Sequence, residues 1–167
     1  MGFARRVNQV LHDEHVGAIM LMQRLNQFVA RSRGAGMPDT SDHGVSKLLN
    51  DLSTDLSGEV ERHFAFEEEW LFPFLSATGE EGIGAHLTEE HAVIRPLGRK
   101  IAALARTAAA SGFDDAGWAE FCRVGPDLCQ RLTVHAQKEE MALLPLLEEA
   151  LDAETDLRLL EEYSATA

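Results

Sequence analysis

Two segments of the sequence repeat a histidine that is followed four residues later by a glutamate. The first is His63-Phe-Ala-Phe-Glu67 and the second is His135-Ala-Gln-Lys-Glu139. In both segments a second glutamate follows at once, and a proline stands ten residues after the histidine. Imidazole and carboxylate groups serve as acids and bases or as metal ligands. Residues four apart on a helix differ by about 40° around the axis, so each His and its Glu would point in the same direction.

Two further histidines lie at helical spacing from apolar residues. His15 follows Leu11 by four residues, and each of His15 and His91 comes directly after a glutamate. The separations are similar, since His135 comes 72 positions after His63 and His91 comes 76 positions after His15. The chain therefore resembles a duplication, in which each half has a helix with a lone His and then a helix with His-x3-Glu.

Six ionisable side chains on apolar faces need a compensating partner. A single buried histidine is more often a hydrogen-bonded core residue than a ligand. A buried glutamate is rarer, because an unpaired carboxylate in the core is destabilising unless it is neutralised or bound. Almost no Lys or Arg shares these stripes. We therefore predict that the six residues bind metal; they are His15, His63, Glu67, His91, His135 and Glu139.

The ligand types limit the choice of metal. Imidazole and carboxylate without thiolate suit iron, manganese or zinc. Four His and two Glu are too many for one tetrahedral zinc ion. They fit two six-coordinate ions, each with about two imidazoles and a share of both carboxylates. Such a site keeps positions for water, oxo or an external ligand, so the pattern predicts a dinuclear centre that binds something small.

Four long amphipathic segments would position these side chains. Apolar residues recur at helical spacing over 7–29, 49–74, 87–104 and 121–146. Breaker-rich stretches lie between them at 33–42, 78–84 and 111–115. Short connections favour antiparallel neighbours, so the predicted fold class is all-α, an up-down-up-down antiparallel four-helix bundle. We expect this bundle to occupy residues 1–150 and a C-terminal extension or short helix to occupy 151–167.

Some neighbouring residues are expected to support the site rather than bind metal. Glu68 and Glu140 point about 100° away from the adjacent predicted ligands and should be solvated or should support them. Pro73 and Pro145 should bend or loosen their helices. Tyr163, the only tyrosine, is expected to lie outside the bundle. In the fourth segment, a Gly-Pro pair at 125–126 should kink the helix or divide it.

The four motifs together resemble the haemerythrin family, specifically its HHE cation-binding domain. They are His15 after Asp-Glu, His63-x3-Glu67, His91 after Glu-Glu and His135-x3-Glu139. The resemblance covers about residues 5–150 and implies a haemerythrin-like bundle. It also implies a non-haem di-iron centre that is bridged by the two glutamates and an oxo or hydroxo group and that binds dioxygen or nitric oxide. It favours iron over zinc or manganese.

The sequence departs from the oxygen-carrying haemerythrins, which have a fifth histidine and a His-x4-Asp motif in the last helix. A fifth histidine here must be His12 or His86. His12 lies about 60° from His15 on the helical wheel, whereas His86 lies about 140° from His91. Geometry therefore favours His12, while the family position just upstream on the third helix favours His86. Both candidates remain open at this stage. His43 is expected at the surface or at a helix start.

The predicted function is the binding of dioxygen or nitric oxide at the dinuclear centre, for storage, sensing or detoxification. One alternative is a di-iron enzyme that scavenges peroxide or nitric oxide. Another is an iron-handling or iron–sulfur repair protein, although relatives proposed for repair carry an amino-terminal cysteine-bearing segment that is not found here. No residue is assigned a catalytic role, and the protein partner is unknown.

Size, charge and cysteine content narrow the function classes. The 167 residues suit one domain, and the net charge of −13 disfavours nucleic acid and anionic membranes as partners. Cys122 and Cys129 would be about 10 Å apart along a helix, too far for a disulfide. No apolar run reaches membrane-spanning length, and the first residues lack a signal-peptide pattern. We therefore expect a cytoplasmic protein.

Overall fold

The computed structural model of the protein describes residues 2–166, and over that range the chain is all-helical. Eight α-helices and two π-helical turns follow one another within it. In chain order they are α1 (Arg6–Ser32), α2 (His43–Asp55), α3 (Glu59–Phe66), η1 (Glu67–Leu71), α4 (Phe72–Ala77), α5 (Glu81–Ser111), α6 (Asp115–Lys138), η2 (Glu139–Leu143), α7 (Leu144–Ala150) and α8 (Ala153–Ala165). The all-helical fold class is confirmed.

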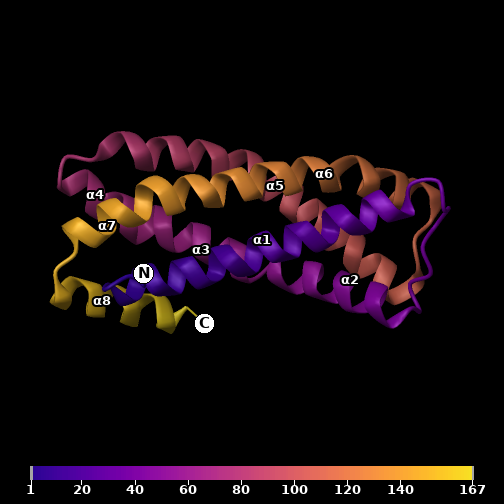
Figure 1. Cartoon of the computed structure of the whole chain (residues 1–167), viewed down its shortest axis with the longest axis horizontal. Helices are drawn as coiled ribbons and strands as arrows, with labels where there is room; N and C mark the ends of the chain where they lie inside the picture. Colours follow the sequence, from indigo (N-terminus) through magenta and orange to yellow (C-terminus); the bar gives the residue numbers. More distant parts are fainter. Residues whose placement is uncertain (1, 167) are drawn as a thin grey trace.

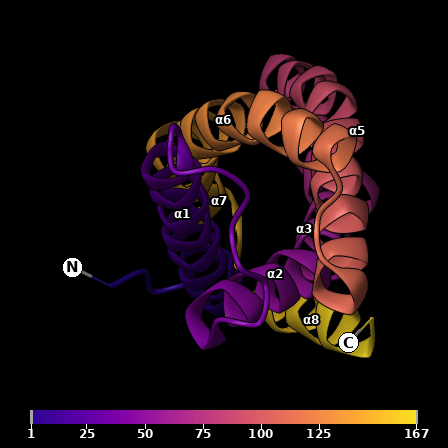
Figure 2. The same ribbon diagram turned by 90° about the vertical axis from the view of Figure 1, so that its right-hand side faces the viewer.

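The helices form an elongated bundle around a common interior (Figures 1 and 2). α1 packs on α6, α2 packs on α5, and α5 packs on α6. The connections from α1 to α2 and from α5 to α6 lie at one end of the bundle, and those from α4 to α5 and from α7 to α8 lie at the other (Figure 1). α8 packs against α1. No helix in the described part of the chain is long and apolar enough to cross a membrane.

The helix starts follow local capping chemistry. The side chains of Asp42, Asp114 and Asp152 accept hydrogen bonds from backbone N–H groups in the first turns of α2, α6 and α8. Each such cap typically contributes about 1 kcal/mol to stability. The predicted breaker at 33–42 is a loop, and the one at 111–115 contains a loop at 112–114. The third breaker was predicted at 78–84, but the connection is shorter, because only residues 78–80 lie between α4 and α5.

One expected division of a helix is absent, and one unexpected break is present. α6 is a single helix with Pro126 inside it and Gly125 buried, so the Gly-Pro pair does not divide it, and a kink at this pair stays a prediction. The second segment, expected to be continuous, breaks at 56–58. Gly58 precedes α3 there, and a Cβ atom at this position would lie 2.9 Å from the Thr54 carbonyl oxygen. A close backbone approach, which periodicity does not reveal, therefore ends α2.

Two apolar clusters fill the interior of the bundle. A polar layer lies between them along the length of the helices. One cluster contains Leu25 of α1 and Phe121 of α6, and the other contains Leu11 of α1 and Leu147 of α7. His15 comes between the residues that α1 supplies to the two clusters. The polar layer is therefore shielded from solvent at both ends of the bundle.

Candidate metal centre

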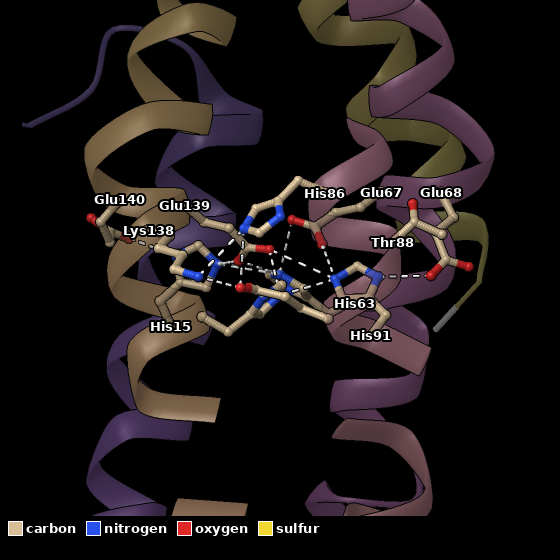
Figure 3. Close-up of polar contacts among 12 residues, drawn as sticks. His15, His63, Glu67, Glu68, His86, Thr88, His91, Lys138, Glu139 and Glu140 are labelled. Atoms are coloured by element: carbon tan, nitrogen blue, oxygen red, sulfur yellow. Dashed lines mark hydrogen bonds and ion pairs between the residues drawn. The ribbon is translucent and has the colours of Figure 1, made fainter. Parts of the chain in front are cut away.

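The six predicted ligands meet in the polar layer. Figure 3 labels five of them, His15, His63, Glu67, His91 and Glu139. α1 supplies His15, α3 supplies His63, η1 supplies Glu67, α5 supplies His91, α6 supplies His135 and η2 supplies Glu139. None of the six is more than 6 % exposed. In both His-x3-Glu pairs the helix type changes between the two ligands, because His63 and His135 lie in α-helices whereas Glu67 and Glu139 begin π-helical turns. The structure thus brings together every residue that the duplicated pattern singled out.

The donor atoms fall into two overlapping groups, within each of which they lie at most 4.8 Å from one another. The first group is His15, His63, Glu67 and Glu139, and the second is Glu67, His91, His135 and Glu139. The two glutamates belong to both groups, whereas each histidine belongs to one. This is the arrangement expected of two adjacent ions that share carboxylates.

Glu139 turns one oxygen toward each pair of histidines. Its Oε2 lies 2.7 Å from His15 Nε2 and 3.7 Å from His63 Nε2. Its Oε1 lies 2.7 Å from His135 Nε2 and 3.8 Å from His91 Nε2. A single carboxylate therefore faces all four imidazoles, with its two oxygens divided between the two groups.

Glu67 divides its oxygens in the same way. Its Oε1 lies 3.2 Å from His63 Nε2, and its Oε2 lies 3.3 Å from His91 Nε2. All four oxygens of Glu67 and Glu139 are buried without a hydrogen-bond partner. The nearby imidazole nitrogens are close to these oxygens but are not aligned as hydrogen-bond donors. Because buried carboxylate oxygens without such partners are costly, these four atoms fit cation ligation.

The Nε2 atoms of the histidines face one another in pairs. They are 3.2 Å apart in His15 and His63 and 2.9 Å apart in His91 and His135. Two ligands at right angles on one ion, each about 2.1 Å from it, are separated by about 3 Å. Two neutral imidazoles would repel at this distance if both presented lone pairs without a cation. The nitrogen spacing therefore fits one ion for each pair.

A second ring of glutamates holds the histidines from behind. Each Nδ1 lies 2.6–2.7 Å from a carboxylate oxygen; the pairs are His15 with Glu140, His63 with Glu14, His91 with Glu68, and His135 with Glu90. An ionised carboxylate only accepts hydrogen bonds, so Nδ1 carries a proton, and whenever the imidazole is neutral its Nε2 lone pair faces the interior. Such partners orient a ligating histidine and make it a stronger donor.

Sequence reasoning placed only half of this ring. Glu68 and Glu140 do support the histidines, as one of the two expectations for them allowed. Glu14 and Glu90 were missed, although both directly precede a lone histidine, and that repetition was the available signal. Each reaches across to a histidine on another helix, so its role depends on how the helices are rotated relative to one another.

Each outer glutamate also contacts a further side chain, which is an arginine, a lysine or a histidine. Glu14 accepts from Arg62 at 3.2 Å, Glu68 from Arg95 at 2.9 Å and Glu90 from Lys138, and His12 Nδ1 lies 2.9 Å from Glu140. His12 thus occupies the place that Arg or Lys fills elsewhere. His86 Nε2 lies 3.2 Å from Glu90, and its side chain is 58 % exposed. Within the described residues, neither histidine belongs to the two donor groups.

A π-helical turn begins at each shared glutamate. The N–H of Phe72 bonds to the Glu67 carbonyl, and the N–H of Leu144 bonds to the Glu139 carbonyl. In both cases a proline is the second residue after the π-turn, and its missing N–H favours a wider turn over a regular one. The two prolines therefore loosen their helices as predicted, and the form of the loosening is a π-turn. Single π-turns are frequent at functional sites.

A small cavity of about 90 Å³ adjoins one side of the cluster. His15, His63, His135 and Glu139 contribute to its wall. Much of the rest of the wall is apolar; it includes Leu21, Met22, Leu56, Val60, Phe64, Leu132 and Ala136. The cavity is large enough for a few water-sized molecules. A small ligand could therefore reach the donor atoms in a largely apolar environment.

Charge coupling within the cluster is strong. Burial alone would lower the pKa of His91, but Glu139 and Glu67 outweigh it and raise the pKa to about 9. The pKa values of His63 and His135 are also raised, because adjacent carboxylates outweigh burial. Burial favours a higher pKa for Glu139, yet the imidazoles around it lower the pKa well below its ordinary value. Without metal, the cluster is therefore held together by imidazolium–carboxylate attraction.

We expect the metal-free protein to lose stability as the pH rises from about 6.5 to about 9. A histidine whose pKa is raised on folding contributes stability that is complete below the unfolded value of about 6.5. That contribution disappears as the pH passes the folded value, about 9 for His91. Thermal unfolding of chelator-treated protein across this range measures the effect. His91→Gln should flatten the pH dependence, and a melting temperature that rises with pH in the wild type would contradict the expectation.

Comparison with known families gives one match. A family model described as Hemerythrin HHE cation binding domain matches residues 6–147. The matched range contains all six clustered residues and ends before α8 begins. A comparison with curated proteins found no match.

Proposed function

We propose, from the premise that the chain belongs to the hemerythrin HHE cation-binding family, that it is a non-haem di-iron protein that binds dioxygen or nitric oxide. One observation carries the proposal. Glu67 and Glu139 each turn one oxygen toward each pair of histidines, and all four oxygens are buried without hydrogen-bond partners. Two cations would satisfy these atoms together with the facing Nε2 lone pairs.

The residues divide naturally between the two ions. His15 and His63 would hold one ion, His91 and His135 the other, and Glu67 and Glu139 would bridge them. When bound, the ferrous ions supply electrons and open positions to a small ligand. The donor set of imidazole and carboxylate without thiolate suits iron. The fold that holds the two ions would be the predicted up-down-up-down four-helix bundle within residues 1–150, and the predicted extension at 151–167 contains α8, which packs on α1.

The surroundings favour a small ligand of low charge. The cavity beside His15 and His63 has a largely apolar wall, which favours an uncharged molecule over a hydrated ion. The Nδ1 bonds to Glu140 and Glu14 keep the two imidazoles oriented while a ligand binds and leaves. Dioxygen and nitric oxide meet both requirements of size and charge.

An alternative function, the scavenging of peroxide or nitric oxide, is favoured by the positions of His12 and His86. Both histidines lie outside the two donor groups and contact outer glutamates instead. With four imidazoles rather than five, more positions would remain open for reaction. Stable complex formation and turnover therefore distinguish the two functions.

Anaerobic loading with ferrous iron is expected to give two iron ions per chain, because six donors in two groups exceed the needs of one ion. Iron content measured by elemental analysis after gel filtration tests this. Dioxygen, nitric oxide and peroxide added in turn should then change the optical spectrum. A stable spectrum supports binding, whereas repeated consumption of added ligand supports the scavenging enzyme. One zinc ion per chain with no iron uptake would sink the proposal.

A further inference from the structure

α8 lies outside the range that the family model matches, yet it is fixed on the bundle next to the candidate centre. The Asp156 carboxylate accepts hydrogen bonds from the backbone N–H groups of Arg6 at 2.9 Å and Val7 at 3.0 Å. It thereby satisfies donors at the start of α1, which lacks a side-chain cap of its own. Leu159 and Tyr163 of α8 are buried in the apolar cluster at this end of the bundle.

Tyr163 reaches from α8 to the second ring of glutamates. Its ring packs on Phe66 with centroids 4.5 Å apart, and its hydroxyl donates to Oε1 of Glu14. The other oxygen of Glu14 accepts from His63 Nδ1 at 2.7 Å. The Arg62 guanidinium lies over the Tyr163 ring, 4.8 Å from its centroid, and bonds to the same Oε1. Tyr163, Glu14 and His63 thus form a continuous hydrogen-bonded chain.

The tyrosine hydroxyl keeps its proton in this setting. Burial and the adjacent Glu14 carboxylate both raise the pKa of Tyr163. Glu14 in turn has a lowered pKa, because its bonds to His63 and Tyr163 outweigh the effect of burial. The hydroxyl therefore acts as a neutral donor to a charged carboxylate, which is a strong type of hydrogen bond.

The other half of the duplicated pattern lacks this contact. Glu90 corresponds to Glu14, because each directly precedes a lone histidine, and Glu90 accepts from His135 as Glu14 does from His63. The remaining oxygen of Glu90 faces Lys138, whose side chain is 43 % exposed, and not a tyrosine. The chain has a single tyrosine, so the two halves cannot be equivalent at this position.

We propose that Tyr163 is a positioning residue that weakens the donor strength of His63 through Glu14, so that α8 makes the two iron sites unequal. The role rests on the proposed di-iron function. The hydrogen bond from the phenol withdraws negative charge from the Glu14 carboxylate. Glu14 therefore attracts the Nδ1 proton of His63 less strongly. A less polarised Nδ1–H leaves His63 a weaker electron donor, which favours ferrous over ferric iron at its site. His63 and Glu14 both line the small cavity, so a ligand in the cavity can reach the tuned site.

The substitution Tyr163→Phe removes the hydroxyl and keeps the ring on Phe66. We expect two iron ions to remain bound, because the substitution leaves all six donor side chains in place. The reduction midpoint of one site should move to a lower potential, and one of two iron signals in the Mössbauer spectrum should change. Lys138→Met, the matched change beside Glu90, should alter the other signal.

Two further measurements separate this role from docking of α8 and from the metal hypothesis. Leu159→Ala loosens α8 without touching Glu14; if it reproduces the potential shift while Tyr163→Phe does not, the proposal is overturned. In metal-free protein, nuclear magnetic resonance of the ring N–H protons should show a change at His63 and none at His135 in Tyr163→Phe. No change at His63 overturns the proposal, whereas a His63 change in a protein that takes up no iron overturns only the di-iron function.

Discussion

Replacing His63 or His135 with alanine is expected to lower the iron content from two ions per chain to one or none. Each histidine belongs to one donor group, so its loss removes an imidazole from one ion and leaves space beside a shared glutamate. The change also leaves Glu14 or Glu90 without its imidazole partner next to a buried site. Elemental analysis of protein loaded anaerobically with ferrous iron, together with its optical spectrum, measures the result.

His12→Ala and His86→Ala are the matched controls, because both remove an imidazole near the site but outside the two donor groups. Both variants should retain two iron ions. If one of these histidines does serve as a fifth ligand, its loss should alter the oxidised spectrum and speed autoxidation by admitting water. Full iron content in both His63→Ala and His135→Ala would overturn the assignment of the site.

The helical stripes were sufficient to predict which side chains meet. His63 and Glu67 are one turn apart on a segment whose other inward-facing residues are apolar. The same holds for His135 and Glu139. Ionisable groups at buried helical positions are a strong signal, because their burial is costly without a partner. The structure brings these two His-Glu pairs together with His15 and His91. Their role as metal ligands remains a prediction that iron loading tests.

The contacts between helices could not be predicted in the same way. Periodicity gives the face on which Glu14 or Glu90 lies, but the partner depends on the rotation and height of the neighbouring helix. Tyr163 was expected outside the bundle, and although it lies in a separate helix beyond the matched range, its side chain is buried in an apolar cluster of the bundle, so that expectation is wrong for the side chain. Its contact with Glu14 follows from the docking of α8 through Asp156, a long-range interaction without a periodic signal.

The two candidate fifth histidines show the limit of the helical wheel. The wheel places His12 near the inward face, and His12 does point toward the site region. It gives no distance, however, and in the structure Glu140 lies between His12 and the nearest clustered histidine, His15. His86 follows from family position alone, and its exposed side chain pairs with Glu90. Both side chains contact the outer glutamates rather than the donor groups.

Removing metal from the loaded protein is expected to lower its melting temperature by about 8–16 °C. Free iron at 1,000 times its dissociation constant stabilises the native state by about 4 kcal/mol, and each kcal/mol shifts the midpoint by roughly 2–4 °C in a domain of this size. Without metal, the buried oxygens of Glu67 and Glu139 rely on imidazolium ions that are not aligned as hydrogen-bond donors.

Calorimetry of chelator-treated and iron-loaded protein at neutral pH measures this difference. His86→Ala, an exposed change, should preserve it, whereas His63→Ala should lose at least half of it because fewer ions bind. Since ferrous iron competes with protons for the imidazoles, the difference should also shrink as the pH falls. Equal melting temperatures with and without iron across neutral pH would mean that the buried carboxylates are satisfied by the histidines alone, and the cluster would then be a structural charge network.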